Sequence, residues 1–195
     1  MFRRSSLVPV AALLCSLFLS IACATPPTRE MDQAQGAIDA ARAAGADRFA
    51  VEQYEAAVKA LKSAQDAVGQ RDYRLALNYA LDSRDRAQKA AKEAAIQQAV
   101  LRSASERKLS EVTALLDRAE RQLKAADAAR IPRRATAAPR TAIAAAEASL
   151  QKAGTSIQDG NYTISQEELA ESAKNLQSAM AEIDTAMKGR GKTRK

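Results

Sequence analysis

Few side chains in this sequence have the type and spacing that catalysis or metal binding needs. The chain has no histidine and two cysteines, Cys15 and Cys23, which both lie in the N-terminal apolar stretch. Histidine is the commonest general base and metal ligand, and cysteine thiolates act as nucleophiles and zinc ligands. The body of the chain therefore offers no disulfide, no thiolate zinc site and no cysteine nucleophile.

Carboxylates are plentiful, but they fall beside lysine and arginine on the polar faces of the expected helices. The adjacent pair Glu167 and Glu168 could work as an acid and a base, yet a solvated helix face explains the pair better. The sequence also has no phosphate-binding glycine loop and no serine–histidine pair. We therefore expect a protein that is not an enzyme, with no cofactor and no bound metal.

Two clusters of basic residues could contact anionic material. They are Arg130, Arg133, Arg134 and Arg140 beside a proline-flanked break, and Lys188, Arg190, Lys192, Arg194 and Lys195 in the C-terminal tail. Cations near a charged lipid surface contribute about 1 kcal/mol each, although a solubilising role explains both clusters equally well. The net charge of +7 comes from the leader and the tail, without which basic and acidic residues are equal in number. Because a nucleic-acid-binding domain carries a basic face, we expect no nucleic acid partner.

Residues 1–22 have the pattern of a signal peptide. A short cationic start precedes the mostly apolar run of residues 7–21, which is too short to span a membrane comfortably and right for a signal-peptide core. The small residues at 22 and 24 fit a signal-peptidase site, with a mature chain that begins at Thr25.

The segment Leu19–Cys23 also resembles the lipobox of bacterial lipoproteins, apart from Ser20, where leucine is preferred. In that family the cysteine becomes the first mature residue and carries acyl groups, so the resemblance implies lipidation of Cys23. We favour this reading because Cys23 directly follows the apolar run and residues 23–28 then form a short tether. Ala24 lacks the aspartate that marks inner-membrane retention in enterobacterial lipoproteins, so the resemblance implies the outer membrane rather than the inner one.

The rest of the chain is organised around residues 73–129, which hold no proline or glycine and predict one helix about 85 Å long. Flanking helices are expected over residues 30–44 and 49–70, from residue 139, and over 162–187. Gly45 is expected to end the first helix, and Asp47 and Asp72 to cap the next two. Strand-like alternation is absent from the sequence, so the fold class is all-α.

An internal duplication is predicted at an offset of 89 positions. The apolar stripe Tyr54, Ala57, Leu61, Ala64 and Val68 corresponds to Ile143, Ala146, Leu150, Ala153 and Ile157. The predicted hairpin turn Asp72–Tyr73 corresponds to Asn161–Tyr162, so a polar cap precedes an aromatic in both. Leu77 disagrees, since it corresponds to Gln166. Alanine-rich helices align easily with one another, but the paired turns argue against chance.

These elements predict an elongated all-α fold of two three-helix units that share the long helix. The first unit covers residues 29–100 and the second residues 101–188, followed by a disordered basic tail over 189–195 whose glycines end the helix. Between the units the apolar stripe fades. The long helix is therefore either straight or hinged near Arg102–Glu106.

Residues 24–95 resemble an uncharacterised alanine-rich domain of bacterial envelope lipoproteins. The resemblance rests on residues 43–46, on the stripe over residues 54–68 and on the run Arg-Asp-Tyr-Arg-Leu-Ala over residues 71–76. The domain is similar in outline to tetratricopeptide hairpins. In some proteins it precedes a peptidoglycan-binding domain of the outer-membrane-protein-A type, which does not follow in this sequence. The resemblance implies location and fold and brings no catalytic residues.

Together these patterns predict a lipoprotein of the bacterial cell envelope that faces the periplasm. It would act as a helical spacer or as an adaptor for another envelope protein, with the membrane bound through acylated Cys23. The alternative function is polyanion binding, in which the two basic clusters hold membrane or cell-wall material. Alanine stripes allow close helix approach, so a homo-oligomer is compatible with the sequence.

Overall fold

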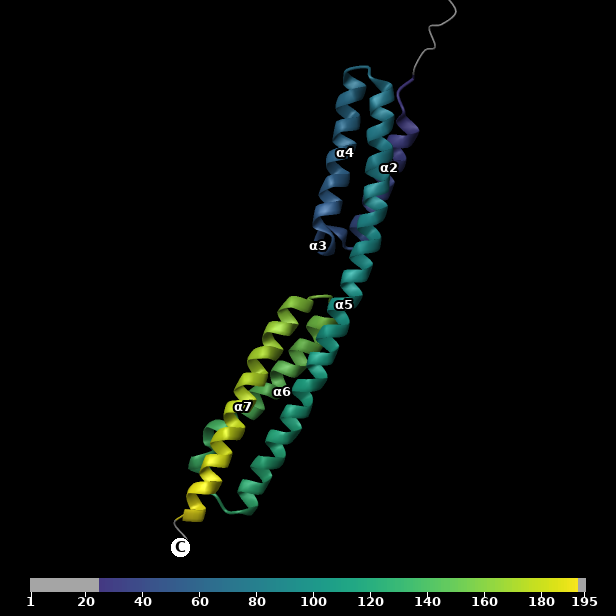
Figure 1. Cartoon of the computed structure of the whole chain (residues 1–195). Helices are drawn as coiled ribbons and strands as arrows, with labels where there is room; N and C mark the ends of the chain where they lie inside the picture. The colour runs from purple at the N-terminus through teal and green to yellow at the C-terminus, as the bar shows by residue number, and fades with distance from the viewer. Residues whose placement is uncertain (1–24, 193–195) are drawn as a thin grey trace, which may run out of the picture. The chain divides into compact units, whose positions relative to one another are not determined.

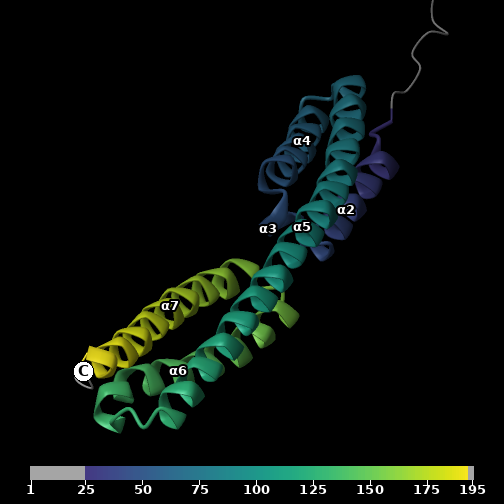
Figure 2. The same cartoon turned by 60° about the horizontal axis from the view of Figure 1, so that its bottom comes forward.

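The computed structural model of the chain describes residues 25–192, with side chains described for residues 25–189. Helices and no strands form within that part of the chain, which confirms the all-α class (Figures 1 and 2). In order, the elements are α2 (Thr28–Ala43), α3 (Ala46–Phe49), α4 (Val51–Gly69), α5 (Tyr73–Ala128), the 3-10 helix η1 (Arg133–Thr136), α6 (Ala137–Gln158) and α7 (Tyr162–Lys192). The long helix α5 is continuous, as predicted.

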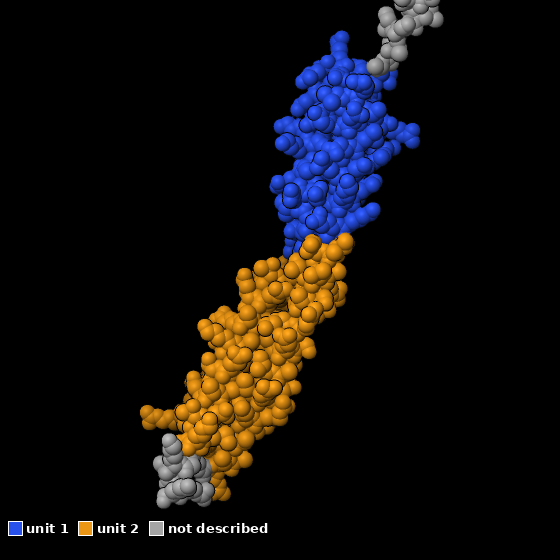
Figure 3. Space-filling view, in the orientation of Figure 1, with its two compact units in different colours: residues 1–94 blue, residues 95–195 orange. Residues whose placement is uncertain are grey.

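The chain divides into two compact units, residues 1–94 and 95–195 (Figure 3). Helix α5 contributes its first part to unit 1 and the remainder to unit 2. The predicted boundary after residue 100 and the observed one after Ala94 enclose a bare stretch of α5, because residues 95–100 are all exposed. Farther along, Arg102 donates a 2.8 Å hydrogen bond to Glu106. The pKa of Arg102 is raised, mainly by this hydrogen bond and in second place by the negative charge of the Glu106 carboxylate.

Alanine makes up most of the core of unit 1. The buried cluster draws on α2, α3, α4 and the first part of α5, and it consists of Ala34, Ile38, Ala41, Ala46, Ala50, Tyr54, Ala57, Leu61, Ala87, Ala90 and Ala94. Small side chains let helices approach closely but bury little apolar area each. A polar contact supplements this thin core, because Arg42 Nε in α2 donates to the Tyr54 hydroxyl in α4 over 2.7 Å.

Helix α2 ends at a left-handed glycine, as predicted. Gly45 has a φ of 79°, and its N–H donates to the Arg42 carbonyl over 2.8 Å. A Cβ at this position would lie 3.1 Å from Cδ2 of Phe49. The prediction that Asp47 caps the next helix is wrong. The chain turns at Gly45 directly into α3, which contains Asp47, and α4 begins only after Ala50, where φ is −145°.

The core of unit 2 contains larger side chains. Its main cluster consists of Val112, Leu116, Ala119, Ile143, Ala146, Ala153, Leu169, Ala173 and Leu176. Near the start of α7, the Gln166 amide donates to the buried Ser105 hydroxyl of α5 over 3.1 Å. In the predicted repeat, Gln166 corresponds to Leu77. Its hydrogen bond to Ser105 gives a physical reason for a polar residue at this position. Ser105 is the first buried residue of α5 after Ala94.

The predicted end of the last helix is wrong. We expected Gly189 and Gly191 to end helical order and residues 189–195 to be disordered, but α7 continues to Lys192. An interior glycine costs a helix about 1 kcal/mol relative to alanine, and the preceding turns are anchored. Ile183 is buried there with Ile131 and Ala126, and Ala186 and Met187 pack against this cluster. Residues 193–195 lie outside the described residues.

Candidate functional site

The four predicted turn residues lie at the two hairpins. Oδ1 of Asp72 accepts a 3.0 Å hydrogen bond from the Leu75 N–H, which confirms Asp72 as the cap of α5. Tyr73 is half-buried beside it, and Tyr162 is buried at the start of α7 after Asn161. All four residues belong to the hairpin turns, so we assign them a structural role rather than a binding role.

The two hairpin turns share one hydrogen-bonding pattern at the offset of 89 positions. In the first turn, the N–H groups of Gln70, Arg71, Asp72 and Ala76 donate to the carbonyls of Asp66, Val68, Ala67 and Asp72. In the second turn, those of Asp159, Gly160, Asn161 and Ser165 donate to Thr155, Ile157, Ser156 and Asn161. Arg71 and Gly160 both adopt positive φ, 61° and 75°. The duplication itself stays a prediction, but the hairpins can be compared position by position.

The predicted lipidation site, Cys23, lies outside the described residues, so lipidation stays a prediction. Within residues 25–192, no helix has both the length and the apolar character of a membrane-spanning segment.

Residues from both predicted basic clusters lie at one end of unit 2. The loop between α5 and α6 packs on the end of α7 through Ile131 and Ile183. Arg130, Arg133, Arg134 and Lys188 are all exposed at this end. None of these four forms an ion pair with another described residue. The side chains of Arg190, Lys192, Arg194 and Lys195 are outside the described part of the chain.

Arg140 does not belong to this exposed set. Its guanidinium forms an ion pair with Asp127 at the end of α5, and its Nε donates to the Thr136 hydroxyl over 3.4 Å. Arg140 therefore connects α5, η1 and α6, and its charge is compensated. The sequence-based grouping of Arg140 with the polyanion contacts misses this structural role, because Asp127 is thirteen positions away in another helix.

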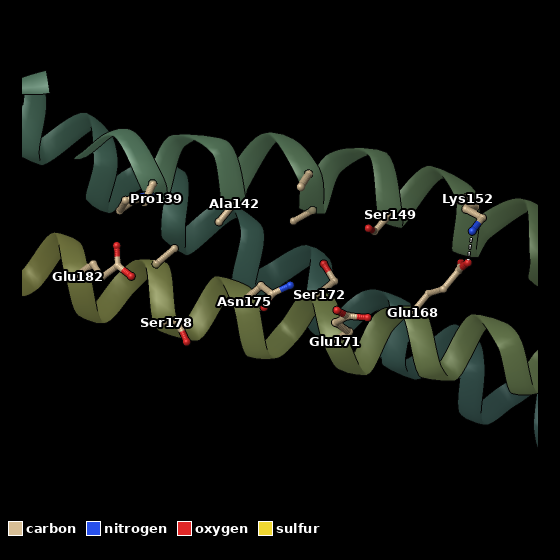
Figure 4. A pocket seen from close by; sticks show the side chains of 14 residues that line it. Pro139, Ala142, Ser149, Lys152, Glu168, Glu171, Ser172, Asn175, Ser178 and Glu182 are labelled. Carbon is tan, nitrogen blue, oxygen red and sulfur yellow. Dashed lines mark ion pairs between the residues drawn. The ribbon is translucent and has the colours of Figure 1, made fainter. Parts of the chain in front are cut away.

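A groove of about 590 Å³ lies between α6 and α7 (Figure 4). Small side chains line most of it. The residues are Ala138, Pro139, Ala142, Ala145, Ala146, Ser149 and Lys152 on α6, and Glu168, Glu171, Ser172, Asn175, Ser178, Ala179 and Glu182 on α7. Lys152 Nζ lies 2.5 Å from Oε1 of Glu168 and joins the two helices at one end of the groove.

The groove contains buried polar atoms that no other described residue satisfies. Ser172 is 4% exposed, and its hydroxyl has no hydrogen-bond partner there. Figure 4 shows this hydroxyl directed into the space between the helices. Oε2 of Glu168 is likewise buried without a partner, although Oε1 pairs with Lys152. A buried polar group without a partner costs about 1–3 kcal/mol, so these two atoms distinguish the groove from the rest of the α6–α7 surface.

The corresponding position of the other hairpin behaves differently. Ser83 stands 89 positions before Ser172 and is fully buried. Its hydroxyl donates a 2.8 Å hydrogen bond to the Ala57 carbonyl across the α4–α5 hairpin. In unit 2 the hydroxyl of Ser172 has no such partner, and a groove lies in front of it. The unsatisfied hydroxyl is therefore a property of the α6–α7 hairpin and not of this hairpin type.

Sequence reasoning missed the groove. Its signal in the sequence is weak: Ser172 occupies a buried position of α7, where the stripe pattern alone would favour an apolar residue. Glu168, one of the adjacent carboxylates considered above, is held by Lys152, whereas Glu167 is exposed. In the described part of the chain, no three aspartate, glutamate, cysteine or histidine side chains gather as a metal site would require.

The chain matches no protein-family model, no curated protein and no solved structure in the three comparisons made. The resemblance of residues 24–95 to an alanine-rich domain of envelope lipoproteins therefore stays a prediction.

Proposed function

We propose that this chain is a non-enzymatic lipoprotein of the bacterial cell envelope, held to the membrane through acylated Cys23 and acting as a helical adaptor. The observation that carries the adaptor role is the α6–α7 groove, whose Ser172 hydroxyl is buried and unpartnered. Small residues along the groove allow another backbone to come close, as in ridge-into-groove helix packing. The N-terminal sequence supports the anchor and the periplasmic side.

The anchor is tested by the intact mass of the protein purified from bacterial membranes, beside a Cys23→Ala variant. A chain that begins at Cys23 and carries acyl groups supports the anchor. A chain that begins at Thr25 contradicts it and would leave a secreted protein.

The adaptor role is tested by photo-crosslinking in living cells. The photoreactive residue p-benzoylphenylalanine would replace Ala145, an exposed residue of the groove lining, or, as the matched control, the exposed Ala114 of α5, which does not line the groove. We expect one defined adduct from position 145, absent from position 114 and lost when Cys23→Ala removes the anchor. Equal labelling from both positions, or none from either, contradicts the adaptor role.

A second candidate function is polyanion binding. It is favoured by the exposed cations Arg130, Arg133, Arg134 and Lys188 at one end of unit 2, none of which pairs with a described acid. Several unpaired cations on one surface are attracted to anionic lipid or to cell-wall polymers, and salt screens that attraction.

This candidate is tested by sedimentation with vesicles containing phosphatidylglycerol. The variant Arg133→Glu/Arg134→Glu should bind several-fold less at low salt than the unchanged chain. The variant Lys59→Glu/Lys62→Glu, which alters two exposed lysines of α4 by the same total charge, is the control and should bind normally. An equal loss of vesicle binding in both variants would mean that binding depends on net charge alone, and it would contradict a defined binding surface at this end of unit 2.

A further inference from the structure

The α6–α7 groove has the length and the lining of a site for one helix. Its lining residues run from Ala138 to Lys152 on α6 and from Glu168 to Glu182 on α7. Each run covers about 21 Å at 1.5 Å per residue, which is about four helical turns. Alanine and serine line most of this length, and small side chains on a helix pair allow a third helix to approach closely.

The charge along the groove is predominantly acidic. Lys152 is the basic residue among those that line it, and it is already paired with Glu168 over 2.5 Å. Glu171 and Glu182 are exposed and form no ion pair with any other described residue. They stand eleven positions apart on α7, which is about three turns and puts both on one side of the helix.

We propose that the groove binds an amphipathic α-helix of a protein partner. The face of that helix toward the groove carries small residues, and it presents two lysine or arginine side chains about eleven positions apart to Glu171 and Glu182. A hydroxyl, amide or ammonium group near the middle of the helix satisfies the buried Ser172 hydroxyl. This inference rests on the proposed adaptor function and specifies the chemistry of the partner.

Three observations carry the assignment together. The groove is long and lined by small side chains, its unpaired charges are acidic and spaced by whole turns, and Ser172 is buried without a partner. The α4–α5 hairpin lacks the last of these features, because Ser83 there donates to the Ala57 carbonyl over 2.8 Å. Unit 1 is therefore expected not to bind the same helix and serves as an internal control.

The test uses a synthetic helical probe and the full chain in detergent micelles. The probe is a fluorescein-labelled peptide of about five turns with an alanine–serine face and lysines eleven positions apart. Fluorescence anisotropy should show saturable binding that weakens as salt rises. A peptide with glutamates in place of the lysines should not bind.

Charge reversal in the protein is the decisive variant. Glu171→Lys/Glu182→Lys should weaken probe binding about tenfold or more, and both sites are exposed, so the fold is retained and can be checked by circular dichroism. The control is Glu55→Lys/Asp66→Lys, which reverses two exposed acids eleven positions apart in α4 and should leave binding unchanged. Ala142→Trp should block binding by filling the groove.

Other outcomes overturn the inference in distinguishable ways. If the probe does not bind, or binds the Glu171→Lys/Glu182→Lys variant equally well, the helix chemistry is wrong. The adaptor function survives that result when position 145 still gives its crosslinked adduct. If sedimentation equilibrium shows a dimer of the chain that Ala142→Trp abolishes, the occupant is a second copy, and the partner-helix assignment is overturned.

Discussion

The hydroxyl of Ser83 in α5 donates a hydrogen bond of 2.8 Å to the main-chain carbonyl of Ala57 in α4. This bond joins two helices of unit 1 at a point where the facing residues, serine and alanine, are both small. At the corresponding position of unit 2, the hydroxyl of Ser172 is buried without such an acceptor. The two serines therefore have opposite expected effects on stability.

Replacing each serine by alanine should separate these effects. Ser83→Ala should lower the free energy of unfolding by about 1 kcal/mol, the net value of one buried hydrogen bond. Ser172→Ala should leave it unchanged or raise it by up to about 1 kcal/mol, because an unsatisfied hydroxyl is removed from the interior. Urea unfolding followed by circular dichroism measures both changes. Equal destabilisation by the two substitutions would mean that Ser172 has a partner within the protein.

The two left-handed glycines should differ in their tolerance of alanine. Gly160→Ala should cost about 1–2 kcal/mol, the penalty for a left-handed alanine, since the nearest atom to its new Cβ is the Tyr162 hydroxyl at 4.0 Å. Gly45→Ala should cost more, because its Cβ would also lie 3.1 Å from Cδ2 of Phe49. Thermal unfolding of both variants provides the ranking, and the reverse order would contradict the observed geometry.

The cap of α5 can be removed with little other disturbance. Asp72→Ala should lower the free energy of unfolding by about 1 kcal/mol, because the Leu75 N–H loses its acceptor. Asp72→Asn keeps an oxygen at the same place and should restore most of the loss. Denaturant titration measures the pair. An unchanged stability in Asp72→Ala would show that another group, or solvent, satisfies the Leu75 N–H.

The arginines at the basic end of unit 2 should divide into two classes. Arg140→Gln should destabilise the protein by about 0.2–1 kcal/mol, as expected for a partly exposed ion pair with Asp127. Arg133→Gln and Arg134→Gln should each change stability less than Arg140→Gln does, because neither side chain has an acidic partner among the described residues. Differential scanning calorimetry separates the classes, and a stable Arg140→Gln protein would contradict the structural role given to Arg140.

Much of the helical layout could be predicted from local chemistry. The absence of proline and glycine over residues 73–129 predicted α5, which the structure shows over Tyr73–Ala128. The glycine at position 45 predicted the end of α2. The cap at Asp72 was likewise visible as a short polar residue before a periodic segment. These features depend on residues near one another in the chain, so a single sequence contains the information they need.

The features that were missed depend on how the chain turns and on contacts between helices. Asp47 is as good a cap in sequence as Asp72, but the turn at Gly45 puts it inside α3. Arg140 looked like part of a basic cluster because its partner Asp127 is in another helix. The groove is determined by how α6 and α7 pack, so hydrophobic periodicity alone could not predict that Ser172 would lack the acceptor that Ser83 has.

The alanine-rich core of unit 1 also has a calorimetric consequence. Unfolding exposes apolar surface, which raises the heat capacity, and polar surface, which lowers it; the net increase is about 12–15 cal/mol/K per residue in ordinary domains. Ala34, Ala57, Ala87 and Ala94 are fully buried in this core yet expose little new apolar area when the helices separate. The heat-capacity increment per residue of unit 1 should therefore lie below that range. Its stability curve should be correspondingly flat, so that cooling toward 0 °C weakens it less than it weakens a domain with a leucine-rich core.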